Sequence, residues 1–156
     1  MPFLETAFGK LLMTFGMSMV PVLELRGAIP VGVAAGLPPA VACAVAVAGN
    51  LLPVPLIMLL ARRVADWLRG TAFFGPKIEW LERRAHLKGR IVRRDRLLGL
   101  VVLVALPLPG TGAWPGALVA SVLDIRMRHA IPAIFLGLVI AGMLITLLTM
   151  GLIHLF

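Results

Sequence analysis

The sequence predicts an all-α integral membrane protein that is an inverted repeat. Each half is a re-entrant helical hairpin followed by a transmembrane helix, and a basic interfacial helix joins the halves. Apolar residues make up 60% of the 156 residues, whereas about 45–50% is usual in a soluble domain. Only 14% of the residues are charged. The charges are concentrated in one segment with two apolar blocks on each side, so we expect a single membrane domain.

Two of the apolar blocks are long enough to cross a membrane as helices. Residues 39–60 would form a helix about 33 Å long and residues 130–156 one of about 40 Å, and both exceed the hydrocarbon core of about 30 Å. Asn50, Pro53 and Pro55 interrupt the first of these blocks. We expect them to kink the helix, because proline has no N–H to continue the hydrogen-bond ladder.

Residues 97–123 are predicted to form a re-entrant hairpin rather than a further crossing. The middle of this stretch, residues 106–116, contains three Pro and three Gly where a continuous helix needs better helix formers. The flanking arms would each be about 15 Å long as helices, which is half of a bilayer. A hairpin also keeps Arg126 and Arg128 on the same side as the basic segment, as the positive-inside rule favours.

Residues 11–37 are predicted to form the first re-entrant hairpin, with short apolar arms around a polar break at residues 21–27. With two crossings in the whole chain, both termini lie on the outer face of the membrane. In an alternative arrangement residues 3–20 cross the membrane, and the N-terminus then lies in the cytoplasm.

A weak internal repeat relates the two halves. At an offset of 85 residues, segment 26–36 aligns with segment 111–121 and four of eleven positions are identical. The identical pairs are Gly27/Gly112, Ala28/Ala113, Pro30/Pro115 and Ala35/Ala120. We therefore divide the chain into a first half (1–60), a basic segment (61–96) and a second half (97–156), with the halves in opposite orientation as in secondary transporters.

The basic segment holds most of the net charge. Between Arg62 and Arg96 the chain has eleven Lys or Arg and four Asp or Glu, a net charge of +7, and the whole chain has +8. The positive-inside rule predicts that residues 61–96 lie on the cytoplasmic side of the cell membrane. Trp67 and Trp80 lie among these charges, as in a helix that rests on anionic lipid head groups. We expect membrane lipids, and not nucleic acid, as the partner of this segment.

The predicted tip of the first hairpin contains Glu24, Arg26 and Gly27. An ionisable residue at the bilayer centre costs several kcal/mol and usually marks a path for a substrate, an ion or a proton. Burial favours a neutral Glu24 and a nearby Arg favours a charged one, so Glu24 suits proton or cation exchange. Arg26 keeps its charge and suits an anionic head group such as a phosphate. The alternative is an ion pair with a structural role only.

The predicted tip of the second hairpin has no charge, but Pro109, Gly110, Thr111 and Gly112 offer backbone amides at the start of a half-helix. Such N-termini attract anions, so these four residues are candidates for substrate binding. The alternative is a plain tight turn. Asn50 is a further candidate for the substrate or ion path, although an amide in the membrane also joins helices by hydrogen bonding.

The remaining polar groups predict no catalytic chemistry. Arg126 and Arg128, between the second hairpin and the last helix, are expected to contact lipid head groups. The sequence has no Ser/His/acid set, no metal-ligand spacing and no nucleotide-binding loop. We therefore expect no enzyme activity, no metal site and no cofactor.

Three segments carry a resemblance to a known family: residues 21–32 (PVLELRGAIPVG), 49–55 (GNLLPVP) and 107–118 (PLPGTGAWPGAL). With these motifs the chain resembles the small multidrug export family, a distant relative of the DedA and VTT-domain membrane proteins. The resemblance implies paired re-entrant hairpins that face each other within the membrane. From the DedA relatives it implies movement of lipid carriers such as undecaprenyl phosphate, dependent on a proton or sodium gradient.

Individual residues carry over from the resemblance only in part. Glu24 matches the acidic residue of the first hairpin in the DedA relatives. The second hairpin departs from them, because they place Arg near its Pro-rich turn and this chain has Pro-Gly-Thr-Gly at residues 109–112.

The resulting hypothesis is a small DedA-like transporter that moves an amphipathic or lipid-phosphate substrate, or a lipophilic drug, and is coupled to protons or sodium through Glu24. The alternative is a membrane scaffold or assembly factor that transports nothing. We also expect a homodimer, because small residues that allow close helix packing recur on both transmembrane helices. They are Ala40, Ala44 and Ala48 on the first helix and Gly137, Ala141 and Gly142 on the last. The alternative is that these faces pack only against each other within one chain.

Overall fold

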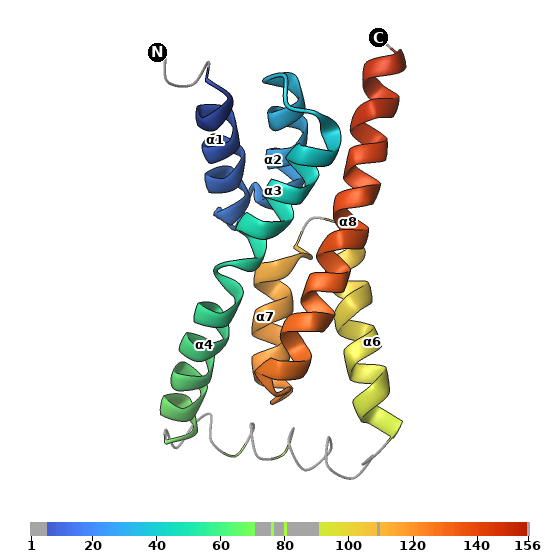
Figure 1. The fold of residues 1–156 in the computed structure, drawn as a ribbon. Helices are drawn as coiled ribbons and strands as arrows, with labels where there is room; N and C mark the ends of the chain where they lie inside the picture. Colours follow the sequence, from blue (N-terminus) through green and yellow to red (C-terminus); the bar gives the residue numbers. More distant parts are fainter. Residues whose placement is uncertain (1–5, 71–75, 77–79, 81–90, 109, 156) are drawn as a thin grey trace.

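The computed structural model describes residues 6–70, 76, 80, 91–108 and 110–155, and the regular elements in these ranges are all helices (Figure 1). The all-helical prediction is therefore confirmed for this part of the chain. The helices are α1 (Ala7–Met19), α2 (Glu24–Ala34), α3 (Pro39–Leu51), α4 (Val54–Arg69), α6 (Ile91–Ala105), α7 (Ala113–Val122) and α8 (Met127–Leu155).

Two stretches are long and apolar enough to cross a membrane, judged by length and composition. They are Pro39–Val64, with 26 residues, and Met127–Leu155, with 29 residues. The two predicted transmembrane helices are thus confirmed as candidate spans. The first is interrupted between Leu51 and Val54, at the prolines that predict a kink, and continues as α4.

The other helices form two antiparallel pairs that enter the molecule from opposite ends (Figure 1). The pair α1 and α2 lies at the end where α1 begins and α8 finishes, and the pair α6 and α7 lies at the other end. These helices have 10 to 15 residues and lengths of about 15–23 Å, so each is too short to cross a bilayer alone. The turns that join each pair meet near the middle of the molecule.

The first pair differs from its sequence prediction in where the turn lies. The polar residues 24–27 were expected in the turn, but the turn is at residues 20–23 and α2 begins at Glu24. The backbone N–H of Gly27 donates to the carbonyl of Leu23 at 2.9 Å, so residues 24–27 already follow the helical hydrogen-bond pattern.

The predicted helix between the halves lies mostly outside the described residues. Residues 76, 80 and 91–96 are described, and residues 91–96 form the beginning of α6. The second pair of helices therefore starts earlier than the expected residue 97.

Two glycines of α8 allow this helix to pack closely against α6 and α3. A Cβ on Gly137 would lie 2.7 Å from the Val104 side chain of α6, and a Cβ on Gly142 would lie 2.8 Å from Cys43 Sγ of α3. Such distances are too short for a larger side chain unless the neighbour moves. Small residues are typical of helix contacts in membranes, where backbones approach closely.

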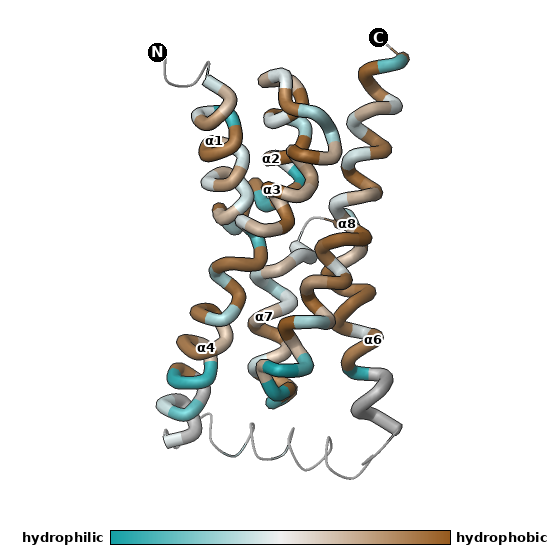
Figure 2. The backbone as a smooth tube through the Cα atoms, in the orientation of Figure 1, coloured by the Kyte–Doolittle hydropathy of each residue, from teal (hydrophilic) through white to brown (hydrophobic). Residues whose placement is uncertain are grey.

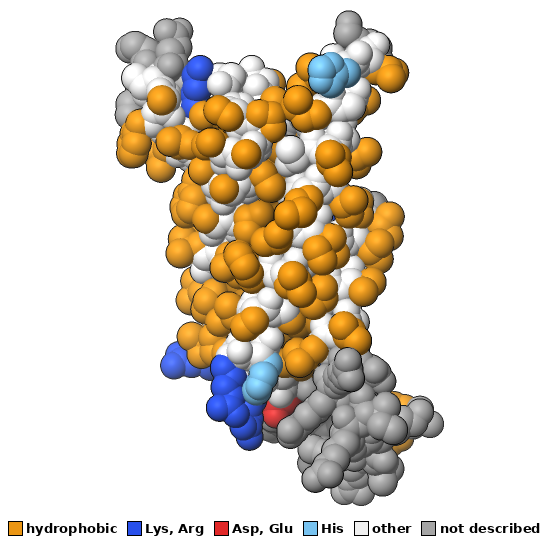
Figure 3. Space-filling view, turned by 45° about the vertical axis from the view of Figure 1, so that its right-hand side comes forward, with side chains coloured by type: hydrophobic (Ala, Val, Ile, Leu, Met, Phe, Trp, Pro, Cys, Tyr) orange, Lys and Arg blue, Asp and Glu red, His pale blue; other side chains and the backbone are white. Residues whose placement is uncertain are grey.

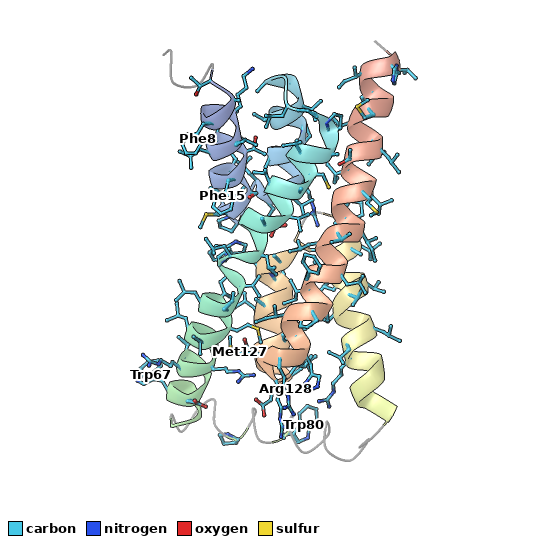
Figure 4. All side chains as sticks on the ribbon, viewed as in Figure 1. Phe8, Phe15, Trp67, Trp80, Met127 and Arg128 are labelled. Atoms are coloured by element: carbon cyan, nitrogen blue, oxygen red, sulfur yellow. The ribbon has the colours of Figure 1, made fainter. Side chains whose placement is uncertain are left out.

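The surface has an apolar band and a basic end. Hydrophobic residues predominate along the middle of the helices (Figure 2). In the space-filling view hydrophobic side chains cover the visible flank, and Lys and Arg side chains gather mainly at the end away from the start of α1 (Figure 3). Trp67, 72% exposed, and Trp80, 56% exposed, lie at that same end with Arg128 (Figure 4). Aromatic and basic side chains at one boundary of an apolar band are typical of the interface between lipid and water.

Candidate functional site

The candidate site is the contact between the two turns at the middle of the molecule. We define the first tip as residues 20–27, which are the turn after α1 and the beginning of α2. The second tip is residues 106–108 and 110–114, which follow α6 and include the beginning of α7. Hydrogen bonds connect residues 80 to 85 positions apart in the sequence across this contact. The contact therefore links the two halves of the chain.

Arg26 of the first tip is held by oxygen atoms of the second tip. Its Nη2 donates to the carbonyl of Leu106 at 2.9 Å, to the carbonyl of Thr111 at 3.0 Å and to Thr111 Oγ1 at 2.6 Å. Its Nη1 donates to the carbonyl of Leu108. Carbonyls at and just past the end of α6 have no N–H donor within that helix, and the dipole of α6 favours a cation there.

The Thr111 hydroxyl completes this arrangement. It accepts from Arg26 and lies 2.6 Å from the carbonyl of Leu106 and 2.8 Å from that of Leu108, to either of which it donates. The guanidinium of Arg26 thus has four protein oxygens as partners. In this conformation both Nη1 and Nη2 donate to the second tip, whereas the expected partner of Arg26 was an anionic head group.

Glu24 of the first tip lies at the other side of the second tip, at the start of α7. Its carboxylate lies beside Gly112 and the backbone N–H of Trp114. A Cβ on Gly112 would lie 2.6 Å from the carboxyl carbon of Glu24, and Gly112 has a φ of 131°, so glycine is required there on both counts. Gly112 is the N-cap of α7 and supplies no side chain of its own for capping. The Glu24 carboxyl, from the other half of the chain, lies beside this helix start, where a capping side chain is usual.

Trp114 makes a bond in the opposite direction. Its indole Nε1 donates to the carbonyl of Met19, the last residue of α1, at 3.2 Å. Each tip therefore satisfies backbone groups that the broken helices of the other tip leave free, which an apolar surrounding requires.

Some buried polar atoms at this level have no hydrogen-bond partner among the described residues. They are Glu24 Oε1 and both amide atoms of Asn50, on side chains that are 4% and 0% exposed. Gly32 of α2 faces Ala42 of α3, and these neighbouring helices run in opposite directions (Figure 1). Glu24 is eight residues before Gly32 in α2, and Asn50 is eight residues after Ala42 in α3. Because the two helices are antiparallel, both steps lead toward the middle of the molecule, and Glu24 and Asn50 lie at a similar level along its long axis.

Buried polar groups without a partner are costly, at about 1–3 kcal/mol each. Because native structures rarely retain them without a reason, they mark a candidate binding site. Glu24 belongs to the first tip and Asn50 lies at a similar level, so the unpartnered polar atoms are found where the two tips meet.

The remaining predicted site residues are distributed as follows. Gly27 is half-buried beside Arg26, and Gly110 is exposed with a φ of 83°. Pro109 lies outside the described residues. Arg126 and Arg128 are exposed where α7 joins α8, at the basic end and away from the tips (Figure 4).

Sequence reasoning missed several partners. Trp114 was not among the candidates, although an indole N–H beside a Pro and Gly turn needs an acceptor and could have indicated its role. Leu106 and Leu108 contribute carbonyls, and their apolar side chains carry no signal of that. Arg62 was counted with the basic segment, but its Nη2 donates to the carbonyl of Ile125 at 2.6 Å and so joins α4 to the turn before α8.

Comparison with protein families gives a match. Residues 24–144 match the model of a family described as "Putative small multi-drug export protein". The matched range begins at Glu24 and includes both Arg26 and the second tip. Searches of curated proteins and of solved structures find no match.

Proposed function

The chain belongs to this small multi-drug export family, since the match covers more than half of its length, and we propose that it is a small DedA-like membrane transporter whose substrate binds between the two tips. The substrate is an amphipathic or lipid-phosphate molecule, such as a polyprenyl-phosphate carrier lipid, or a lipophilic drug. The family description and the two apolar helices already indicate a membrane protein with an export role.

One observation carries the proposal: two charged residues meet two helix ends at the centre of an apolar molecule. Glu24 lies at the start of α7 and Arg26 at the end of α6. Broken helices that present their ends at mid-depth are the usual substrate sites of secondary transporters. Ionisable residues at that depth mark transport paths, and Glu24 is the group that couples transport to protons or sodium.

We propose that both short helix pairs are re-entrant hairpins and that the halves form an inverted repeat. The helix bounds support this. When the offset of 85 is added to α1 (Ala7–Met19), the result is 92–104, which lies within α6 (Ile91–Ala105). When it is added to the range 39–69 of α3 and α4, the result is 124–154, which nearly coincides with α8 (Met127–Leu155). The two pairs also enter from opposite ends (Figure 1).

In the cell membrane, the basic end faces the cytoplasm and both chain ends face outward, as the positive-inside rule favours. Arg126 and Arg128, both exposed, contact lipid head groups at the cytoplasmic face.

We also propose a homodimer. Of the two small-residue faces, Gly137, Ala141 and Gly142 are buried within the chain. Ala40, Ala44 and Ala48 on α3 are exposed and remain free for a second copy. A mass of two protomers in nanodiscs is expected, and a single-protomer mass with transport retained would contradict the dimer.

Transport by vesicles that contain the purified protein tests the proposed function. A fluorescent short-chain phosphate lipid and a lipophilic dye are added, and their arrival at the inner leaflet is measured with a quencher that does not cross the membrane. We expect transport above that of empty vesicles, loss with Glu24→Gln, and retention with Asp124→Asn, which removes an acid far from the tips. Vesicles indistinguishable from empty ones would favour a scaffold role.

A further inference from the structure

We propose that Glu24 is an internal substitute for the anionic group of the substrate, and that its carboxylate occupies the place at the start of α7 where a phosphate or carboxylate binds during transport. The substrate class is then an oxyanion on an amphipathic or free molecule. This inference rests on the proposed function, in which the substrate binds between the two tips. It adds that Glu24 occupies the anion site at the start of α7 when no substrate is bound.

The start of α7 is built to receive an oxyanion. The helix has ten residues, and the amides of Ala113 and Trp114 in its first turn have no acceptor within the helix. Gly112 has no Cβ, and this absence leaves the space in which the Glu24 carboxyl lies. Amides and dipole at such an N-terminus favour negative charge.

Glu24 fills this site incompletely, which is the second observation. One carboxylate oxygen, Oε1, has no hydrogen-bond partner among the described residues, although the side chain is only 4% exposed. A buried acceptor without a donor is costly, so displacement of the Glu24 carboxylate by a ligand relieves this cost. Glu24 also has a φ of 47°, in a region that residues other than glycine rarely adopt.

The charges around the site explain why an acid must be there at rest. Arg26 is fixed to the carbonyls of the second tip by its hydrogen bonds, and the start of α7 adds partial positive charge. Without Glu24 the contact would hold an uncompensated positive charge inside the membrane, which is costly. An oxyanion that replaces Glu24 keeps the contact neutral, so exchange between the two is less costly than simple opening.

The test is binding to purified protein in detergent, measured by isothermal calorimetry. The probes are inorganic phosphate, dodecyl phosphate and, as an amphiphile of opposite charge, dodecyltrimethylammonium. The variants are Glu24→Ala, which vacates the site, and Glu24→Gln, which keeps the shape and removes the charge. Asp124→Asn is the matched control, because Asp124 is the other acid among the described residues with a positive φ, 50°, and it lies at the far end of α7.

We expect dodecyl phosphate to bind Glu24→Ala about tenfold more tightly than it binds the wild type. The reason is that the variant lacks the carboxylate that competes with the phosphate for the start of α7. Asp124→Asn should bind like the wild type, and the cationic amphiphile should gain nothing. A gain for dodecyl phosphate alone identifies a lipid-like substrate, whereas an equal gain for inorganic phosphate identifies a free anion. If Glu24→Ala does not elute as a single species, Glu24→Gln decides, with a gain of the same sign.

Unchanged or weaker phosphate binding by the folded Glu24 variants would overturn the proposal. This result is distinct from failure of the proposed function. If the wild type transports and the variants gain no affinity, only the substitute role is wrong. If the variants gain affinity and no substrate moves in vesicles, the anion site stands and the transport function is wrong.

Discussion

Arg26 and Thr111 are hydrogen bonded between the two tips, and they are 85 residues apart, the offset at which the two halves of the chain align. In an inverted repeat, residues at equivalent positions meet only at the two-fold axis. The proposed axis then passes between these two side chains. The pair is complementary rather than identical, because two guanidinium groups at one point would repel each other.

The first prediction follows from this position. Thr111→Arg should strongly destabilise the protein, because a second guanidinium would compete for the carbonyls that hold Arg26 and add a like charge. The double variant Arg26→Thr/Thr111→Arg should recover part of the lost melting temperature if the halves are related by symmetry. Melting in detergent, followed by intrinsic fluorescence, measures both. A double variant no more stable than Thr111→Arg would count against the inverted repeat.

The second prediction concerns Gly112. Gly112→Ala should lower the free energy of unfolding by about 1–3 kcal/mol, because alanine is strained at a φ of 131° and its Cβ meets the Glu24 carboxyl. Gly99→Ala is the control: a Cβ there meets nothing within 4 Å, and Gly99 lies within α6. This control should be neutral or stabilising by up to about 1 kcal/mol, since alanine is the better helix former. Equal melting temperatures for the two variants would refute the close contact.

The third prediction separates stability from function at Asn50. Asn50→Leu should raise the melting temperature, because an apolar side chain of similar size removes a buried amide without partners among the described residues, which costs about 1–3 kcal/mol. Transport in vesicles should fall at the same time if the amide lies on the substrate or ion path. A lower melting temperature would show that the amide has partners, and unchanged transport would remove Asn50 from the path.

The fourth prediction concerns topology. In a Cys43→Ala background, cysteines are introduced by Thr6→Cys, Gly70→Cys and Arg126→Cys and labelled with a reagent that does not cross the membrane. Thr6→Cys should react from outside the cell, whereas Gly70→Cys and Arg126→Cys should react only from the cytoplasmic side. Labelling of Arg126→Cys from outside would eliminate the re-entrant arrangement of α6 and α7.

Sequence patterns are informative where the physical cause is local. Proline and glycine interrupt a helix by their own covalent structure, so the residue types alone locate the break near Pro53 and the turn around residues 106–112. The helical content and the two candidate spans follow in the same way from composition and length.

The partners across the site could not be predicted, because they depend on backbone groups of the other half. Any residue has a carbonyl, so nothing in the sequence marks Leu106 or Leu108 as acceptors for Arg26. The position of Glu24 within α2 rather than in the preceding turn is a related case. Its carboxylate lies beside the start of α7, and that helix is encoded about ninety residues later in the chain.

The distance in sequence between Arg26 and its acceptors also sets an order for biosynthesis. At about 5–20 residues per second, the ribosome needs several seconds to add the 85 residues between Arg26 and Thr111. In the proposed arrangement the first hairpin lacks, during that interval, the oxygens that hold its guanidinium, and we expect it to wait in the translocon or at the water interface. We therefore expect the first tip to reach its final place only after the second tip has been made, so a ribosome that stalls before residue 106 should leave the first tip outside the bilayer core.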